Sequence, residues 1–153
     1  MGNLDKTDQR ILKALQRDGR LSNADLANQV NISAATCHRR TERLFKAGYI
    51  KSVRAIVAPE KVDRETLTMV GVVLNRSTPE SFANFETAIK TLPIVLSCYL
   101  VSGEFDYLLK IRVKDMASFN RLHSEKLLSL PEVSQLRTYF VMKEVVEDAL
   151  LPF

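Results

Sequence analysis

Three arginines follow one another closely between residues 33 and 47, and their guanidinium groups suggest a chemistry at once. When this segment is plotted as a helix at about 100° per residue, one side carries Thr36, Arg39, Arg40 and Arg43. The opposite side carries residues that would pack, namely Ala34, Cys37, Thr41, Leu44 and Phe45. A guanidinium can bind guanine O6 and N7 or clamp a phosphate, and a threonine can contact a thymine methyl group. The pattern predicts a helix that enters the major groove of double-stranded DNA, with a solvated basic face as the alternative.

Three further side chains near this helix could contact the DNA backbone. Lys46 at the end of the helix and Lys51 beyond it would add affinity without sequence choice. His38 lies near the edge of the packing side, where it is either a partly buried packing residue or a phosphate donor. The full set of candidate DNA-binding residues is Thr36, His38, Arg39, Arg40, Arg43, Lys46 and Lys51.

The elements that must position these side chains are predicted by helix caps and apolar spacing. Helices are expected over about residues 5–17, 23–30 and 33–47. Their N-caps are Asp5, Ser22 and Ser33. Asn31 fits the tight connection before the third helix because asparagine enters the left-handed region at low cost. Two short helices joined by a tight turn after a supporting helix make a helix-turn-helix, and the β-formers in residues 49–57 predict a strand or wing.

The charge of this 153-residue chain is unevenly distributed. Residues 1–60 hold eleven Lys and Arg against six Asp and Glu, a balance of +5, whereas residues 61–153 hold eleven against twelve, a balance of −1. A basic segment joined to a near-neutral one is typical of a nucleic-acid-binding module fused to a module with another task. Polarity rises and periodicity lapses over residues 58–66, so we expect domains at 1–57 and 67–153 with a linker between them.

Residues 67–153 alternate between strand-like and helix-like patterns. Strands are predicted over about residues 67–74, 95–102, 107–113 and 134–145. Thr78 and Asp115 cap two amphipathic helices that stop at Pro93 and Pro131. The order β-α-β-β-α-β is the ferredoxin-like arrangement, with two helices on one face of a four-stranded antiparallel sheet. The predicted fold class is therefore α+β, an N-terminal winged helix-turn-helix followed by a ferredoxin-like βαββαβ domain.

The second face of this sheet is too apolar to meet water. Met69 and Val73 alternate with an equally apolar set on the same strand, and so do Tyr139 and Val141 on the last strand. We expect two copies of the chain to pair sheet to sheet as a homodimer.

Several classes of protein are disfavoured. The sequence has no apolar run of about 18 residues and no apolar segment after its first residues, so we expect a cytoplasmic protein that does not enter a membrane. Cys37 and Cys98 are too far apart in sequence to indicate a metal cluster or a disulfide framework. No catalytic constellation or phosphate loop is present, and His123 on an amphipathic helix is better explained as a surface residue than as a base. We expect no enzyme activity, metal or cofactor.

The chain resembles the Lrp/AsnC family of leucine-responsive and asparagine-related transcription regulators across nearly its whole length. The stretches that carry the resemblance are residues 4–8 with 11–12, 19–23, 33–48, 100–107 and 137–139. The resemblance implies a DNA-binding domain, a linking strand and a ferredoxin-like effector domain. It also implies dimers that assemble further, commonly into octamers, with an amino acid bound between neighbouring dimers.

The bend at residues 103–106 is the candidate effector site. Gly103 would let backbone N–H groups approach a carboxylate, and Asp106 is a carboxylate among apolar residues that could accept the ligand ammonium. Alternatively, Asp106 caps the bend through its own backbone or pairs with Lys110 or Arg112. By similarity to the family's effector region, the site comprises Leu100, Val101, Gly103, Phe105, Asp106, Met116, Tyr139 and Phe140.

The candidate lining favours one kind of amino acid. Its side chains are mostly apolar, which suits an aliphatic or thioether effector, leucine or methionine, better than lysine. Glu104 is the exception, since it could serve a basic side chain unless it is solvated in the bend. The sequence thus predicts an amino-acid-responsive regulator whose partners are DNA, a free amino acid and further copies of itself; a winged helix that binds protein is the alternative.

Overall fold

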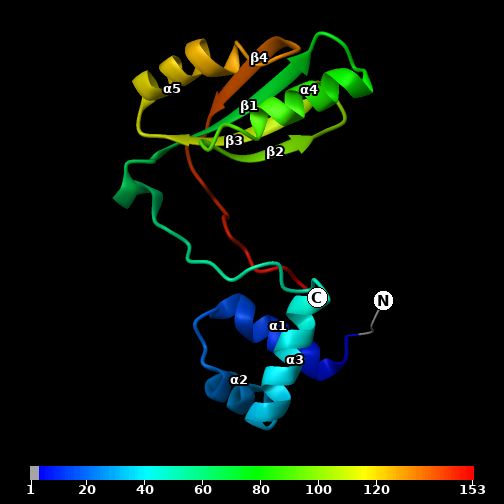
Figure 1. Ribbon diagram of the computed structural model, residues 1–153. Helices are drawn as coiled ribbons and strands as arrows, with labels where there is room; N and C mark the ends of the chain where they lie inside the picture. The colour runs from blue at the N-terminus through cyan, green and yellow to red at the C-terminus, as the bar shows by residue number, and fades with distance from the viewer. Residues whose placement is uncertain (1–3) are drawn as a thin grey trace. The chain divides into compact units, whose positions relative to one another are not determined.

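The structure is a computed structural model, and it describes residues 4–153. The first three residues of the expected domain 1–57 lie outside this range. The chain divides into two compact units (Figure 1). One, here called the helical unit, holds the chain up to Ile56 together with Val146–Phe153; the other, the sheet unit, is Val57–Val145. In this division the last eight residues of the expected second domain, 67–153, are grouped with the helical unit.

The helical unit contains α1 (Lys6–Arg17), α2 (Asn23–Val30) and α3 (Ala34–Lys46). Asp5, Ser22 and Ser33 each accept a backbone N–H at the start of a helix, as expected from their types. Asn31 ends α2 with φ 57° and ψ 55°, the left-handed conformation that turns the chain toward α3. One apolar cluster joins the three helices, and its fully buried members include Ile11, Val30, Cys37 and Leu44.

The strand or wing expected at residues 49–57 is not present in the described chain. Residues 50–58 run without strand pairing, and Val53, Ile56 and Val57 are exposed. The sequence has the side chains of a strand, but a strand also needs a neighbour to take its backbone hydrogen bonds, and a single copy provides none here. Pro59–Val62 then form a short 3₁₀ turn, η1, within the expected linker.

The sheet unit contains β1 (Thr66–Leu74), α4 (Pro79–Ile89), β2 (Val95–Leu100), β3 (Tyr107–Val113), α5 (Met116–Leu122) and β4 (Val133–Phe140). The strands pair antiparallel in the order β2-β3-β1-β4, and both helices cover the same face (Figure 1). This is the expected ferredoxin-like arrangement. Its core joins Val70 and Val72 of the central strand to Phe85 of α4 and Phe119 of α5.

Two elements differ from their predicted lengths. The helix expected up to Pro131 is regular only to Leu122, after which His123–Leu127 widen into a π-helical turn, η2. The strand expected at 134–145 ends at Phe140. The Val141 N–H still donates to the Leu67 carbonyl of β1 at 3.0 Å, but residues 142–145 are not part of the strand, although their apolar pattern continues.

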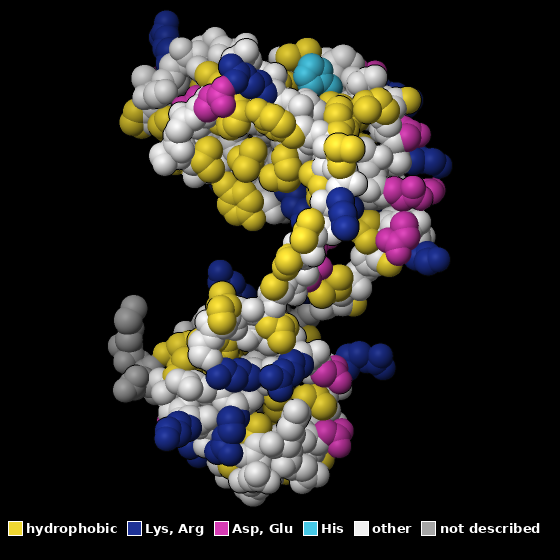
Figure 2. All heavy atoms as spheres, turned by 180° about the vertical axis from the view of Figure 1, so that it is seen from behind, with side chains coloured by type: hydrophobic (Ala, Val, Ile, Leu, Met, Phe, Trp, Pro, Cys, Tyr) yellow, Lys and Arg dark blue, Asp and Glu magenta, His cyan; other side chains and the backbone are white. Residues whose placement is uncertain are grey.

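The face of the sheet away from the helices is partly apolar, as the sequence predicts. Figure 2 shows hydrophobic side chains gathered on this side of the sheet unit. The register places Met69, Val73, Leu108 and Tyr139 there, and Tyr139 is about half exposed. No helix among residues 4–153 is long and apolar enough to cross a lipid bilayer.

Candidate functional site

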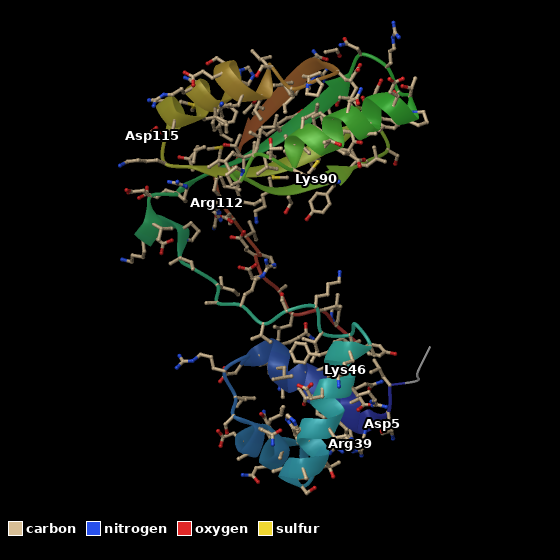
Figure 3. All side chains as sticks on the ribbon, in the orientation of Figure 1. Asp5, Arg39, Lys46, Lys90, Arg112 and Asp115 are labelled. Carbon is tan, nitrogen blue, oxygen red and sulfur yellow. The ribbon has the colours of Figure 1, made fainter. Side chains whose placement is uncertain are left out.

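Helix α3 presents a basic face and a packing face. Cys37 and Leu44 are buried against the other helices, whereas Arg39, Arg43 and Lys46 are exposed. Arg39 and Lys46 are labelled on α3 in Figure 3. His38 is exposed as well, so the reading of this histidine as a packing residue is wrong. Phe45, expected on the packing face, is 39% exposed and stands outside the buried cluster. The exposed part of α3 is therefore wider than the helical plot predicts.

The two arginines in the middle of α3 are engaged by α1. Arg40 Nη1 lies 2.6 Å from Asp5 Oδ2 and 2.8 Å from Asp8 Oδ1. Arg43 donates to the other carboxylate oxygen of Asp8. The Asp8 side chain is only 1% exposed, and Arg40 retains 23%. Arg40 is a candidate DNA contact by sequence, and in the structure it neutralises a buried carboxylate and fastens α3 to α1.

The sequence contains one signal for this arrangement. Asp8 stands four residues before Leu12 and seven before Leu15, so it shares the apolar side of α1. A carboxylate on the buried side of a helix needs a cationic partner, because an unpaired buried charge is very costly. Arginines on a neighbouring helix are the natural candidates. Asp8 thus supports the candidate DNA interface indirectly, because its ion pairs with α3 fix the position of that helix on α1.

Asp5 is the more exposed of the two carboxylates in this cluster. It exchanges capping hydrogen bonds with Asp8, accepting the Asp8 N–H at 2.8 Å. That backbone hydrogen bond, followed by the hydrogen bond from Arg40, lowers the pKa of Asp5 from 3.8 to about 2.

The lowered pKa of Asp5 predicts a pH dependence of stability. Because the folded-state pKa lies below the unfolded one, the contribution of Asp5 is fully present above about pH 4 and is lost as the pH falls toward about 2. We expect Asp5→Asn to make the thermal midpoint of the helical unit fall less steeply across this range than in the wild type. Circular dichroism melts at several pH values test this, and equal slopes for both proteins would contradict it.

The remaining candidate DNA contacts lie at the two ends of α3. Thr36, half-buried in the first turn, accepts a hydrogen bond from the Ser33 hydroxyl at 2.9 Å. Lys51 is exposed in the unpaired segment after α3. Thr36, Arg39 and Lys46 thus mark the beginning, middle and end of one exposed helix.

The candidate effector bend lies between β2 and β3 in the sheet unit. Gly103 has φ 132°, a conformation that side-chain-bearing residues rarely adopt, so glycine is required there for the backbone alone. The Asp106 carboxylate accepts the Leu74 N–H at 2.8 Å and the Ser77 hydroxyl at 3.4 Å. It therefore fastens the bend to the end of β1, which is neither of the two local roles considered from the sequence, capping its own bend or pairing with Lys110 or Arg112.

Phe105 anchors the same bend from the open side of the sheet. A methyl group placed on Gly71 of β1 would come within 2.6 Å of the Phe105 ring, so the ring lies directly on this glycine. The Phe105 and Tyr139 ring centroids are 6.3 Å apart, and the Arg137 guanidinium lies 5.9 Å from the Phe105 ring. Arg137 also forms an ion pair with Glu104. The bend is thus held against the sheet by Phe105, by Asp106 and by the Glu104–Arg137 ion pair.

The other expected effector residues are divided between the two faces of the sheet. Tyr139 lies with Phe105 on the open face, whereas Phe140 contacts Phe119 of α5 on the covered face, with ring centroids 5.2 Å apart. Leu100, Met116, Tyr139 and Phe140 are all substantially exposed, and Val101 is half-buried. A single copy therefore brings Gly103, Phe105, Asp106 and Tyr139 into one region but does not gather all eight residues around one ligand. Within residues 4–153 there is no cluster of three or more His, Cys, Asp or Glu able to hold a metal ion.

Comparison with known families finds one matching family model for each end of the chain. Residues 4–51 match the family model described as a winged helix-turn-helix DNA-binding domain. Residues 67–151 match the Lrp/AsnC ligand binding domain. The leucine-responsive regulatory protein of Escherichia coli strain K12 is 45% identical over 145 residues, which cover 95% of this chain and 88% of that protein.

Solved structures show the same architecture. A transcriptional regulator from Neisseria meningitidis, in complex with L-methionine, has a TM-score of 0.93 and 35% identity, covering 98% of this chain and 97% of its own. An AsnC family regulator from Agrobacterium tumefaciens has a TM-score of 0.91 and 29% identity, covering 97% of both chains. The expected fold and resemblance are confirmed, and the family consists of transcription regulators rather than enzymes. The chain belongs to the Lrp/AsnC family of DNA-binding transcription regulators that carry an amino-acid-binding domain.

Proposed function

We propose that this regulator responds to leucine or methionine, and that the amino acid binds beside the bend at residues 103–106. The observation that carries the choice of ligand is the ion pair between Glu104 and Arg137. Because this pair neutralises Glu104, the bend offers no free carboxylate for a basic side chain at that position. The exposed neighbours Leu100, Met116 and Tyr139 favour an aliphatic or thioether side chain instead. The similar Neisseria protein was solved with L-methionine, which supports the same class of ligand.

The site is completed by a second copy of the chain. Expected effector residues lie on both faces of one sheet, so residues of one copy alone do not enclose a ligand. The partly apolar open face supports a homodimer, and exposed residues at the sheet edges are suited to further assembly, up to the octamer that the family resemblance implies. Such a cytoplasmic assembly would let amino-acid binding favour one arrangement of the DNA-binding units over another.

A thermal-shift screen of the twenty amino acids tests the ligand proposal. Leucine or methionine should raise the unfolding midpoint in a concentration-dependent way, because a ligand that binds the folded state stabilises it. Stabilisation by lysine or aspartate, without any by leucine or methionine, would overturn it.

The DNA contacts are proposed to come from the exposed residues of α3 and the segment after it. Thr36, His38, Arg39 and Lys46 face outward, and Lys51 follows. Arg43, 53% exposed, can contribute a phosphate contact while it pairs with Asp8. Arg40 supports binding by holding α3 in place. A base-reading role is better assigned to Arg39, which forms no ion pair with any described residue.

Arg39→Ala is expected to weaken binding to a specific promoter fragment by about 10- to 100-fold, the usual cost of losing a bidentate arginine contact to a base. The thermal midpoint should be unchanged, because the side chain is exposed. Gel shifts at several salt concentrations measure the effect. Arg76→Ala removes the same charge from an exposed position in the sheet unit and is the matched control. Equal affinities for the two variants would remove Arg39 from the proposed DNA interface.

A further inference from the structure

The helical unit contains a groove that is occupied by the chain's own last residues. One wall is the end of α1 and the bend after it, with Leu12, Leu15 and Gln16. The other wall is segment 49–56, which follows α3. Asp148–Leu151 and Phe153 lie along the groove, and a hollow of about 780 Å³ remains open between them and the two walls.

The groove contacts this segment through its backbone and through one aromatic side chain, as receptors contact bound peptides. The Gln16 side-chain amide pairs with the backbone of Leu151 at both ends, donating to its carbonyl at 3.2 Å and accepting its N–H at 2.8 Å. The Lys13 ammonium lies 5.5 Å from the centre of the Phe153 ring. Recognition through the peptide group positions an extended segment, and the aromatic contact fixes where along the groove it lies.

Residues 146–153 can detach from the groove at low free-energy cost. Leu151 is 71% exposed although its backbone is paired, and Val146 is 78% exposed. Segments with little buried apolar area and solvent-exposed backbone hydrogen bonds open at low free-energy cost. The helical cluster itself includes none of residues 146–153 among its buried members, so the helices keep their core when this segment departs.

The same segment begins close to the candidate effector residues. Tyr139 and Phe140 end β4, and five residues, 141–145, separate them from Val146. Within those five, Glu144 accepts two hydrogen bonds from the buried Arg112 of β3, at 2.6 and 2.7 Å. The chain is therefore held on the sheet at Glu144 and on α1 at Leu151, and six residues, 145–150, separate the two attachments.

We propose that Val146–Phe153 is an internal peptide ligand of the helical unit, and that its docking on α1 transmits the state of the amino-acid-binding domain to the DNA-binding helices. The first half of the proposal stands on the groove and its contacts. The second half rests on the proposed function, in which amino-acid binding controls DNA binding. The chain around residues 141–145 is then a second covalent connection between the two units, in addition to the linker at 58–66.

The test compares full-length wild-type protein with Gln16→Ala and Phe153→Ala. Gln29→Ala is the matched control, since Gln29 is an exposed glutamine on α2 and does not line the groove. Hydrogen exchange followed by mass spectrometry reports docking. Exchange in residues 146–153 should be at least about fivefold faster in Gln16→Ala than in the wild type, because two hydrogen bonds are lost and even one contributes about 1 kcal/mol. Gln29→Ala should match the wild type.

Promoter titrations with and without leucine or methionine then report transmission. In both groove variants the change in DNA affinity caused by the amino acid should shrink at least threefold, while the affinity without amino acid stays within twofold of the wild type. Unchanged exchange in Gln16→Ala would overturn docking, and an unchanged amino-acid effect in both variants would overturn transmission. A wild type whose DNA affinity no amino acid alters would overturn the proposed function and transmission together, leaving docking to be decided by the exchange rates.

Discussion

Asp8→Asn is expected to destabilise the helical unit by about 2–3 kcal/mol and to abolish specific DNA binding. The wild-type carboxylate is almost fully buried and is shared by Arg40 and Arg43. Removing its charge leaves two guanidinium groups close together without their common counter-ion. Breaking a fully buried pair in this way costs more, about 3–5 kcal/mol, but here both arginines retain contact with solvent. Because the cluster fastens α3 to α1, the recognition helix also loses its fixed orientation.

Thermal unfolding and promoter gel shifts measure the two effects. For a unit of this size the midpoint should fall by about 10 °C or more. Glu42→Gln is the control, because Glu42 is an exposed carboxylate on α3 and its replacement changes the charge equally. Arg40→Ala should resemble Asp8→Asn in stability, whereas Arg39→Ala should not. A midpoint of Asp8→Asn equal to that of Glu42→Gln would show that the cluster does not hold the helices together.

The helical unit was predictable from sequence where the signals are local. Asp5, Ser22 and Ser33 cap helices by bonding to backbone groups three residues away, so their effect can be anticipated without knowing the rest of the fold. Asn31 likewise takes the left-handed conformation through a preference of its own. Arg40 could not be placed in the same way. A helical plot shows which side it occupies, but its partners stand 35 and 32 residues earlier, on another helix.

In the sheet unit, too, the contacts between residues far apart in sequence could not be predicted, and the candidate effector bend is an example. Its strand and helix order followed from apolar periodicity, and the structure has that order. The role of Asp106 did not follow, because its acceptor oxygens meet the Leu74 backbone 32 residues away. The predicted strand lengths were wrong for a related reason. Residues 49–57 and 141–145 have strand-like side chains, and whether they become strands depends on a neighbour that the chain's own sequence pattern does not specify.

Gly71→Ala is expected to abolish the response to leucine or methionine while leaving DNA binding intact. The added methyl group would lie 2.6 Å from the Phe105 ring, closer than the two can approach, and Gly71 is in the middle of β1 where the backbone cannot yield. The Phe105 ring must therefore move away from β1, and the bend that carries Gly103 and Asp106 moves with it. Overpacking of this kind costs about 1–3 kcal/mol, so the sheet unit should also unfold at a lower temperature.

A double-mutant cycle separates this steric cause from a general loss of stability. Phe105→Ala alone should lower the midpoint, because it removes the aromatic contact with Tyr139 and Arg137. In that background, Gly71→Ala has no ring to displace and should cost less than about 0.5 kcal/mol, giving a coupling energy of at least about 0.5 kcal/mol between the two positions. Equal costs of Gly71→Ala in the two backgrounds would mean that the glycine acts through the strand rather than through Phe105. The cycle thus identifies whether the bend is held on the sheet by the contact that makes glycine necessary at position 71.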